Sequence, residues 1–592
     1  MATQAGPTAD AQRIKLPGFG LPHDSWNVED SCDDILDLSA VEGWQHEVLT
    51  IRERCMLFFI NEITDKPDWF RKVHDEQILS KWKQEAQEVD WEKIGLMYGD
   101  MSERMFEFCV AELRAKADVY EKTGIVPVLD ATSCVLKSDT AISAELKNDL
   151  RRAIAPLEAV PDYQRDWHPG SDEKVLDLVH PSLFPLVYGR TRVLPDRTIG
   201  IADCLTSIGQ GEIAPVPSIS SPRAEPDLLW STRFQWLPCD VKVTNGGDAK
   251  IQSYINNLHP ADHKPLYGVI EKIISQAMPF WNIVYQSHHS GDLRTTQRAD
   301  CSCVEYELPD GISEEMPEDY EGDEDEYYEM VDESRIYTLP EPEPFEKLVI
   351  TTEDINKKSL FIGNGEKTIQ VIVKLANIHL TPEKPDYAGG SWHIEGQLNE
   401  HIVATAIYYF DNENVTDSRL SFRTKVEADS FCSDLGYEQS DYTGIRKVFG
   451  VGNDDANVQE LGSVLTREDR LIAFPNGFQH RVGGFKLQDS TKPGHRKILA
   501  LFLVAPSLPI ISTANVPPQQ RDWWLREVKT GGSKVSDLPV ELIDMIGAGV
   551  DDFPIGLDEA KEIRQELMAE RGMLDQKVDQ AMADWNFSFC EH

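Results

Sequence analysis

The chain has 592 residues, of which 41% are hydrophobic and 27% are charged, so it contains enough apolar side chains for a sizeable core. Its 101 Asp and Glu residues outnumber its 58 Lys and Arg residues, and the formal net charge is −43. Because nucleic acids and anionic membranes are bound mainly through Lys and Arg, this charge argues against both as partners.

No segment of the sequence is typical of a membrane protein or of a disulfide-bonded secreted protein. The longest apolar runs, such as residues 498–506, are much shorter than the ~20 residues that a membrane-spanning helix needs. The N-terminus lacks the continuous apolar stretch of a signal peptide. Ten cysteines are spread from Cys32 to Cys590 without a CxxC pair. We therefore expect a cytoplasmic or nuclear protein with reduced thiols.

Composition and periodicity divide the chain into six expected segments. In chain order they are an N-terminal arm (1–40), a helical region (41–165), a mixed α/β region that packs on the core (166–300), an acidic insertion (301–345), a strand-rich core (346–515) and a C-terminal helical region (516–592). The predicted fold class is α+β, with helical extensions before and after a β-rich core.

The helical region is expected to contain at least two helices. Apolar residues recur at spacings of three and four in residues 44–63 and 102–124. Ser102 is the expected N-cap of the second helix, and Gly124 is its expected C-cap. In the mixed region, the positions of Pro, Gly and β-branched residues predict short strands within 180–194 and 233–243 and a helix at 259–278.

An acidic run separates the mixed region from the core. Residues 314–333 carry twelve carboxylates and no basic residue. Such a block is typical of a solvated, mobile insertion, because its like charges repel one another. The alternative is a lid or a docking segment for a basic partner.

The core contains short β-branched and aromatic runs that are bounded by Gly, Pro, Asn and Asp. We expect strands at 368–380, 403–410, 470–475, 480–487 and 497–506. Many short strands separated by turns are typical of a barrel or a two-sheet jelly roll. After the core, residues 557–572 mix both signs of charge at helical spacing, which predicts a solvent-facing helix.

Three separated residues of the core can form one metal site. His393 and Glu395 are two residues apart, and on a β-strand such residues project to the same face. His480 follows a turn and opens a strand, 87 residues after His393. A second His-x-Glu pair, His74 and Glu76, lies in a helical pattern, where residues two apart point in different directions, so we set it aside.

Two histidines and one carboxylate are the ligand set of 2-His-1-carboxylate iron(II) sites, which leave three positions of the octahedral ion open. Zinc uses similar ligands, but a closed structural zinc site needs a fourth one from the protein. Taken alone, the spacing of His393 and Glu395 is more often structural than functional. The order His-x-Glu, His and then Arg within a jelly-roll pattern favours the metal site.

Arg496 begins the last strong strand, 16 residues after His480. By alternation it shares a face with Ile498, Ala500 and Phe502. A guanidinium on an otherwise apolar inward face needs a partner, and a dicarboxylate cosubstrate offers one through a two-pronged ion pair. The alternative is an exposed arginine at the end of a strand.

Long motifs of this chain resemble a large, mostly fungal family that is known only as a domain of unknown function. The motifs lie at 180–190, 234–241, 254–260, 391–423 and 470–524. The C-terminal half is more distantly similar to the iron(II)/2-oxoglutarate oxygenases, whose core is a double-stranded β-helix. The resemblance implies that residues 346–515 form such a catalytic core.

Matched residue by residue, the resemblance implies that His393, Glu395 and His480 bind iron(II) and that Arg496 holds the distal carboxylate of 2-oxoglutarate. It implies an enzyme that uses dioxygen to oxidise a C–H bond of a small metabolite, with an amino acid or a secondary-metabolism intermediate as examples. Hydroxylation is the default outcome, and desaturation or ring closure uses the same chemistry. Glu395 departs from the Asp that is more common in the superfamily, and the interval from His480 to Arg496 is longer than usual.

The sequence leaves two other functions open. A protein hydroxylase would use the helical arms and the acidic run to dock a polypeptide. A jelly-roll scaffold would bind no active metal, and it would be expected to have lost a ligand or the arginine.

Residues close to these motifs are assigned less specific roles. Asn399 and Glu400 are expected either to support the metal ligands or to form a turn. Tyr408 and Tyr409 are expected on opposite faces of a strand, so one of them can line the pocket. Lys374 is expected to point outward, and the alternative is an extra contact for an anion.

Overall fold

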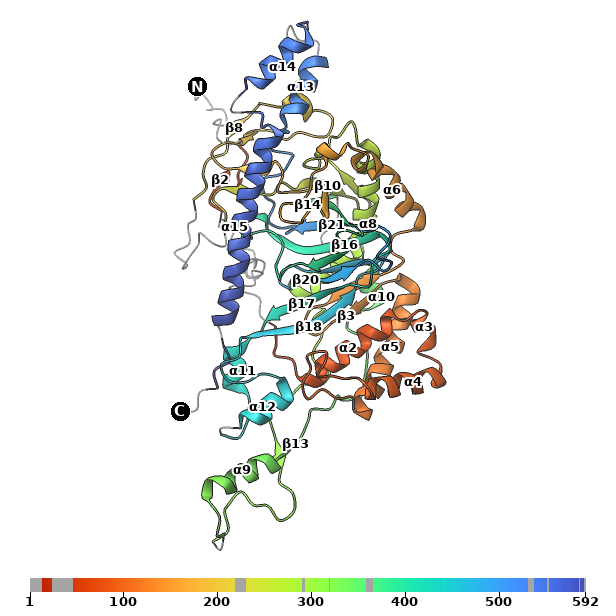
Figure 1. Cartoon of the computed structure of the whole chain (residues 1–592), viewed down its shortest axis with the longest axis vertical. Coiled ribbons are helices and arrows are strands. Elements are labelled where there is room, and N and C mark those ends of the chain that lie inside the picture. Colours follow the sequence, from red (N-terminus) through yellow and green to blue (C-terminus); the bar gives the residue numbers. More distant parts are fainter. Residues whose placement is uncertain are drawn as a thin grey trace, which may run out of the picture.

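Figure 1 shows the computed structural model of the chain. It describes residues 13–23, 46–218, 230–289, 293–318, 320–357, 366–439, 441–530, 537–550, 553–584 and 586–589. Most of the expected N-terminal arm, residues 1–40, lies outside the described residues. Within it, β1 (Leu16–Pro17) pairs with β2 (Gly20–Leu21).

The larger of two central sheets has nine strands. Its order is β11-β10-β14-β21-β16-β19-β4-β3, and β5 also pairs with β14. Its strands are β3 (Val126–Val128), β4 (Val135–Ser138), β5 (Val175–Val179), β10 (Cys239–Val243), β11 (Ala249–Ile251), β14 (Lys367–Leu380), β16 (Ile402–Glu413), β19 (Leu471–Pro475) and β21 (Gly494–Val504). Every pairing in this sheet is antiparallel.

The smaller sheet has four strands in the order β15-β20-β17-β18. They are β15 (Asp386–Gly389), β17 (Arg419–Lys425), β18 (Val458–Leu465) and β20 (Gln479–Lys486). From β14 to β21 the chain passes repeatedly from one sheet to the other. Among the described strands, no ladder of hydrogen bonds joins the two sheets into a closed barrel.

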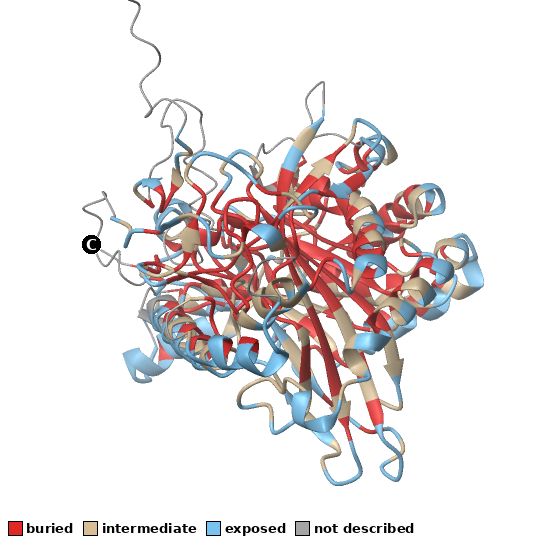
Figure 2. Cartoon of the chain, turned by 90° about the horizontal axis from the view of Figure 1, so that it is seen from above, coloured by how far each residue is buried: buried red, intermediate tan, exposed pale blue. Residues whose placement is uncertain are grey.

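Side chains of the larger sheet alternate between two apolar clusters. On β21, Phe502 belongs to a cluster that also contains Phe422 of the smaller sheet, so this face points inward between the sheets. Leu501 and Leu503 belong to a second cluster on the outer face, together with Trp281. Because both faces are covered, these strands are buried along most of their length, as the centre of Figure 2 shows.

The outer face is covered by α8 (Lys264–His289) and by α6 (Ala144–Glu158), whose buried residues Leu146, Leu150 and Ile154 belong to the outer cluster. The other N-terminal helices pack against the other side of the core; they are α2 (Ile51–Asp65), α3 (Trp69–Lys72), α4 (Glu76–Gln87) and α5 (Glu103–Thr123). The expected caps of α5 are present: Ser102 accepts the N–H of Met105, and Gly124 adopts φ 68°. The helix expected at 44–63 begins at Ile51 because Thr50 caps it.

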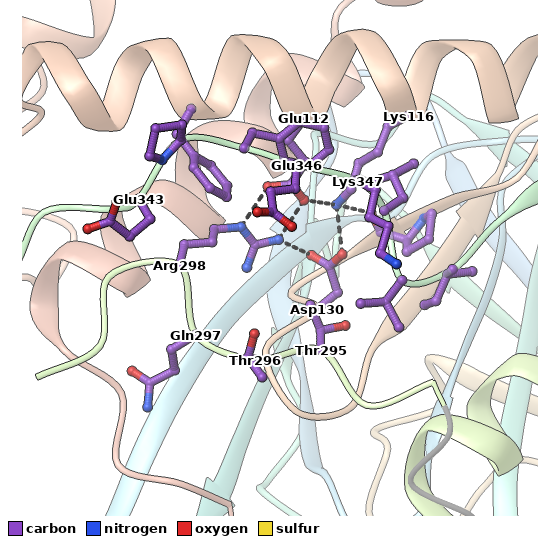
Figure 3. A pocket seen from close by; sticks show the side chains of 17 residues that line it. Glu112, Lys116, Asp130, Thr295, Thr296, Gln297, Arg298, Glu343, Glu346 and Lys347 are labelled. Atoms are coloured by element: carbon purple, nitrogen blue, oxygen red, sulfur yellow. Dashed lines mark hydrogen bonds and ion pairs between the residues drawn. The ribbon is translucent and has the colours of Figure 1, made fainter. Parts of the chain in front are cut away.

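A cluster of buried charges joins α2, α5 and the segment after β3. Arg298 donates to Glu112 at 2.6 and 2.7 Å, to Glu53 at 2.7 Å and to Asp130 at 2.9 Å. Lys116 donates to Asp130 at 2.8 Å. Figure 3 shows most of these side chains at the wall of a cavity of about 200 Å³. Because the buried charges bond to one another, we interpret the cluster as structural.

Besides α8, β5, β10 and β11, the chain between α6 and β14 forms several short elements. They are β6 (Leu186–Val187), β7 (Arg192–Val193), β8 (Glu212–Ile213), β9 (Phe234–Gln235) and α10 (Thr352–Asn356) together with the single turns η2 (Asp162–Gln164) and η3 (Leu205–Ser207). Within 180–194, where short strands were expected, the structure has only β6 and β7, which have two residues each and are separated by a turn.

The acidic insertion is built on a two-stranded stem of β12 (Tyr306–Glu307) and β13 (Ile336–Tyr337). It contains a helix that the sequence analysis did not foresee, α9 (Glu324–Ser334). Asp323 caps this helix, and the three acidic residues of its first turn favour its N-terminus. In Figure 1 the insertion stands away from the sheets at the lower end of the molecule.

Two helices, α11 (Ala428–Asp434) and α12 (Tyr442–Phe449), lie between β17 and β18 in the chain. The C-terminal region forms α13 (Arg521–Thr530), α14 (Val540–Ala548) and α15 (Leu557–Asp584). In Figure 1, α15 runs along one side of the sheets. None of the described helices combines the length and the apolar composition that a membrane span requires.

Candidate metal centre

His393 and His480 lie directly opposite each other on neighbouring chain segments. The N–H of His393 donates to the carbonyl of His480 at 3.2 Å, and the N–H of His480 donates back at 2.9 Å. His480 belongs to β20, whereas His393 follows β15 in a segment that pairs only locally. Because residues opposite each other in a ladder project to the same side, the two imidazoles meet, and their ring centroids are 4.3 Å apart.

Glu395 completes the group. Its Oε1 lies 3.8 Å from Nε2 of His393 and 3.5 Å from Nε2 of His480. Each of the three residues offers a ligand atom within 4.8 Å of the other two. The exposed fraction of the side chain is 3% for His480, 11% for Glu395 and 31% for His393, so the group is open mainly on the His393 side. The structure thus brings together the three residues that the sequence predicts as ligands.

Hydrogen bonds orient two of these residues. Nδ1 of His393 lies 2.9 Å from the carbonyl of Ser391, which leaves Nε2 directed at Glu395. The N–H of Glu395 donates to Oδ1 of Asn476 at 2.9 Å, and Nδ2 of Asn476 donates back to the Glu395 carbonyl at 2.9 Å. The sequence analysis missed Asn476, although it lies in the Pro-Asn-Gly turn directly before His480.

The charges of the three residues suit a cation. Burial opposes ionisation of Glu395, but the neighbouring His393 and His480 and the charge of Lys374 hold its pKa well below the usual value. Burial lowers the pKa of His393, yet the interactions with Glu395 outweigh this and the pKa is raised. Burial and the neighbouring His393 lower the pKa of His480. The site therefore holds an ionised carboxylate, and His480 is the more easily deprotonated imidazole.

Arg496 lies on the inward face of β21, as the alternation predicts. Ala500 and Phe502 share that face and belong to the cluster between the sheets. Arg496 is 2% exposed, and its Nε and Nη1 have no hydrogen-bond partner in the described part of the chain. Its guanidinium lies 4.1 Å from the ring centroid of Phe485 and 5.9 Å from that of Tyr409. A buried guanidinium with unbonded N–H groups is a ready partner for a carboxylate.

Lys374 does not point outward, contrary to the prediction. It alternates with Val373 and Leu375, which belong to the outer cluster, and it lies close enough to Glu395 to lower its pKa. Its direction could not be predicted because both faces of β14 are apolar and covered. Tyr408 and Tyr409 do lie on opposite faces, in the outer and inner clusters respectively.

Glu400 is buried in the turn η4 (Leu398–Glu400) and fixes the surroundings of the site. It accepts hydrogen bonds from the N–H groups of Trp236 at 2.8 Å and Gln397 at 2.5 Å, and from Arg571 at 2.7 Å. Asn399 donates to the carbonyl of Phe234 at 2.8 Å. Both residues therefore hold neighbouring segments in place.

The helix α15 covers the site, although the sequence predicted a solvent-facing helix. Its Leu574 and Val578 pack with Ile394, the residue between the first two ligands. Its Arg571 lies 3.7 Å from the ring centroid of Trp236. Burial raises the pKa of its Asp575 to about 6, with His393 lowering it and Glu395 raising it further. The apolar residues of α15 recur at helical spacing, and this was the available indication of a buried face.

A second group, His168, Asp177 and His180, also brings its ligand atoms within 4.8 Å of one another. It fits a cation poorly. The N–H of Ser182 donates to Nδ1 of His180 at 3.2 Å, which places the proton on Nε2, and Arg564 already lies 3.5 Å from Asp177. We therefore interpret this group as part of the packing between β5 and α15.

Comparisons with known proteins give a family but no activity. A family model described as "Protein of unknown function (DUF4246)" matches residues 103–527. A second model, "Domain of unknown function DUF4246, N-terminal", matches residues 16–85. No curated protein matches the sequence.

Two solved structures show weak similarity. One is titled "Selenomethionine labeled Fe(II)/(alpha)ketoglutarate-dependent dioxygenase TqaL", with 14% identity and a TM-score of 0.15 over 24% of this chain and 46% of that one. The other is a bsmA homolog from Methylobium petroleophilum PM1, with 10% identity and a TM-score of 0.15 over 28% of this chain and 60% of that one. Both matches span less than two thirds of those proteins, and neither supports an argument about fold or function.

Proposed function

This chain belongs to the DUF4246 family of proteins of unknown function, and we propose from its own residues that it is an iron(II)- and 2-oxoglutarate-dependent oxygenase of a small molecule. The observation that supports this most is the meeting of His393, Glu395 and His480 at mutual distances that one ion can bridge. Two imidazoles and one ionised carboxylate are the donor set of non-haem iron(II) oxygenases.

The order of the strands supports a double-stranded β-helix as the core. In such a fold, eight consecutive strands alternate between two facing antiparallel sheets. Here β14, β16, β19 and β21 lie in one sheet, and β15, β17, β18 and β20 lie in the other. The two sheets enclose one apolar cluster between them. The proposed iron ligands come from the end of the β15 segment and from the start of β20.

Each residue of the site has a proposed role. His393, Glu395 and His480 would hold the iron(II), and Asn476 would fix the peptide groups of Glu395. Arg496, with unbonded N–H groups in a buried position, would bind the distal carboxylate of 2-oxoglutarate. Bound iron, 2-oxoglutarate and dioxygen together supply the oxidation of a C–H bond, with hydroxylation as the default outcome.

The cover over the site favours a small substrate over a polypeptide. Glu395 and His480 are almost completely buried, and α15 packs directly on the segment that carries His393. A hydroxylase of folded or extended polypeptides would need an open groove at this position. The alternative function as a non-catalytic scaffold makes a different prediction, because a scaffold requires no uptake of iron.

The test measures iron binding and succinate formation by the purified protein with iron(II), ascorbate and 2-oxoglutarate. We expect the wild type to form succinate even without its substrate, and His480→Ala to lose both iron and turnover. Arg496→Gln should keep its iron but raise the KM for 2-oxoglutarate by about 10- to 100-fold, the loss expected for a charge-assisted hydrogen bond.

The matched control is Lys492→Gln, which removes an exposed charge from the turn before β21 and should behave as the wild type does. A wild type without iron uptake would favour the scaffold. If Arg496→Gln kept the KM of the wild type, the assignment of the cosubstrate anchor would be wrong.

A further inference from the structure

Two opposite charges on α15 face the proposed metal site. Arg571 and Asp575 are four residues apart, so they lie on the same side of the helix. Arg571 stacks on Trp236, and Trp236 in turn stacks on Phe502 of the inward face of β21. Leu574 and Val578 on the same stretch of α15 pack with Ile394, the residue between His393 and Glu395, so this stretch lies against the proposed ligands. The charges of His393 and Glu395 also act on the pKa of Asp575, and the charge of Glu395 acts on that of Arg571.

The charges of Arg571 and Asp575 do not neutralise each other. Residues of opposite charge at this spacing commonly form an ion pair, yet Arg571 and Asp575 form none. Arg571 is bonded to Glu400 at 2.7 Å through Nη2, whereas its Nε and Nη1 have no partner among the described residues. Asp575 is half-buried, and no hydrogen bond or ion pair joins it to another described residue. Buried N–H groups left without a partner, as those of Arg571 are, are typical of a ligand site.

We propose that Arg571 and Asp575 bind the substrate and that this substrate is a small zwitterion of the α-amino acid class. Its carboxylate would bond to the guanidinium of Arg571, and its ammonium group would bond to the carboxylate of Asp575. An α-amino acid carries both charged groups on one carbon atom, so groups one helical turn apart can reach both. This assignment rests on the proposed oxygenase function and adds the substrate class to it.

The surrounding charges agree with this orientation. Lys374 lies near Glu395 and His180, and Arg571 lies near the same two residues, so the acidic end of the substrate would meet two positive charges. Once iron is bound, Glu395 is committed to the metal and no longer offsets Lys374. On the other side, Asp575 has Asp579 as a neighbour, and this side would meet the ammonium group.

The first experiment uses the wild type loaded with iron(II) and 2-oxoglutarate without oxygen. Each of the twenty protein amino acids is titrated in, and binding is followed by the visible absorption of the iron–2-oxoglutarate complex. We expect at least one amino acid to bind. Its amide, which lacks the carboxylate, and its N-acetyl derivative, which lacks the ammonium group, should each bind about 10- to 100-fold more weakly.

Three variants assign the contacts. Asp575→Asn should weaken binding of that amino acid by about tenfold or more and should no longer discriminate against the N-acetyl derivative. Arg571→Lys keeps a positive charge beside Glu400 but loses the two-pronged contact, so it should lose discrimination against the amide. Lys577→Gln, on the exposed side of α15, should bind both derivatives as the wild type does.

The outcomes separate this inference from the proposed function. A wild type that takes up iron and forms succinate but responds to none of the amino acids would overturn the zwitterion and leave the oxygenase in place. A wild type that takes up no iron would overturn both. If Asp575→Asn lowered the affinity for iron instead, Asp575 would belong to the metal site and the substrate assignment would fail.

Discussion

The two imidazoles of the metal centre differ in how readily they release a proton. His480 lies in a buried position that lowers its pKa, whereas the contacts with Glu395 raise the pKa of His393. A metal binds only the neutral imidazole, so a proton on His393 competes with iron. If the site binds iron as we propose, His393 is therefore the residue expected to set the pH dependence of binding.

At the residue scale, we expect the affinity for iron(II) to increase with pH. Below the raised pKa of His393, each unit of pH should increase the affinity by about tenfold, because binding releases one proton, and the increase should level off above that pKa. The pKa of Glu395 is lowered, so its carboxylate stays ionised across this range. Titration of the apoprotein with iron(II) from about pH 5.5 to about pH 8 measures this. A constant affinity would contradict the assignment of a protonated His393.

The candidate ligands could be singled out in the sequence because of their residue types, their order and the resemblance of the motifs to a known family. Strand alternation accounts for Arg496 on β21, but His393 forms an isolated bridge and Glu395 lies in a bend, so alternation along a strand does not explain how those two meet. Asn476 depends on a turn that reaches back across 81 residues, and Asp575 depends on the docking of a distant helix. Such contacts have no local pattern, so the sequence did not reveal them.

At the element scale, the strands with marked β-branched and apolar runs were predictable, including the five-residue β19, whereas β17 and β18 of the core and the short β3 and β4 were not predicted. The strand expected at 368–380 is β14, and that at 403–410 is part of β16, because β-branched and apolar residues predominate over long stretches there. β3 and β4 have three and four residues and are buried along their whole length, so neither shows an alternation. They extend the larger sheet from a region that was expected to be helical.

The cluster around Arg298 gives a prediction about the N-terminal helices. Arg298→Met leaves Glu112, Glu53 and Asp130 buried with only Lys116 as a counter-ion. We expect the free energy of unfolding to decrease by about 3–5 kcal/mol, which is the cost of removing one partner of a buried ion pair and leaving the other buried. Chemical denaturation measures it.

The control for this variant is Arg114→Met. Arg114 lies on α5, as Glu112 of the cluster does, and the substitution removes its exposed ion pair with Glu76. It should cost about 1 kcal/mol or less, as exposed ion pairs do. Equal effects of the two substitutions would contradict the view that the cluster fastens α2 to α5.

At the scale of the whole molecule, residues 309–334 of the acidic insertion lie beyond the stem of β12 and β13. Tyr327 packs there against Tyr320 and donates to the carbonyl of Ser313. After the stem, Glu341 and Pro342 are bonded to the N-terminal helices instead. The charge of the insertion could be predicted from the sequence. Its helix could not, because like charges one helical turn apart repel each other, although Glu itself favours a helix.

We expect that replacing residues 309–334 by a Gly-Gly turn leaves both the fold and the metal site intact. The change removes thirteen carboxylates and no basic residue, so the protein should bind an anion exchanger less strongly. Its Tm should change by about 2 °C or less, because the packing and hydrogen bonds of Tyr327 lie within the deleted segment itself. Calorimetry and iron titration check this, and a large decrease in either the Tm or the affinity for iron would show that the insertion supports the core.

The helix α15 begins thirty residues beyond the stretch matched by the principal family model, yet it supplies Arg571 and Asp575. If α15 contacts the substrate as we propose, the proposed metal ligands and the proposed substrate contacts of this chain lie in separate stretches of its sequence, one inside that match and one beyond it. Transplanting this C-terminal segment between two relatives should exchange their selectivity while the ligands of the ion stay the same.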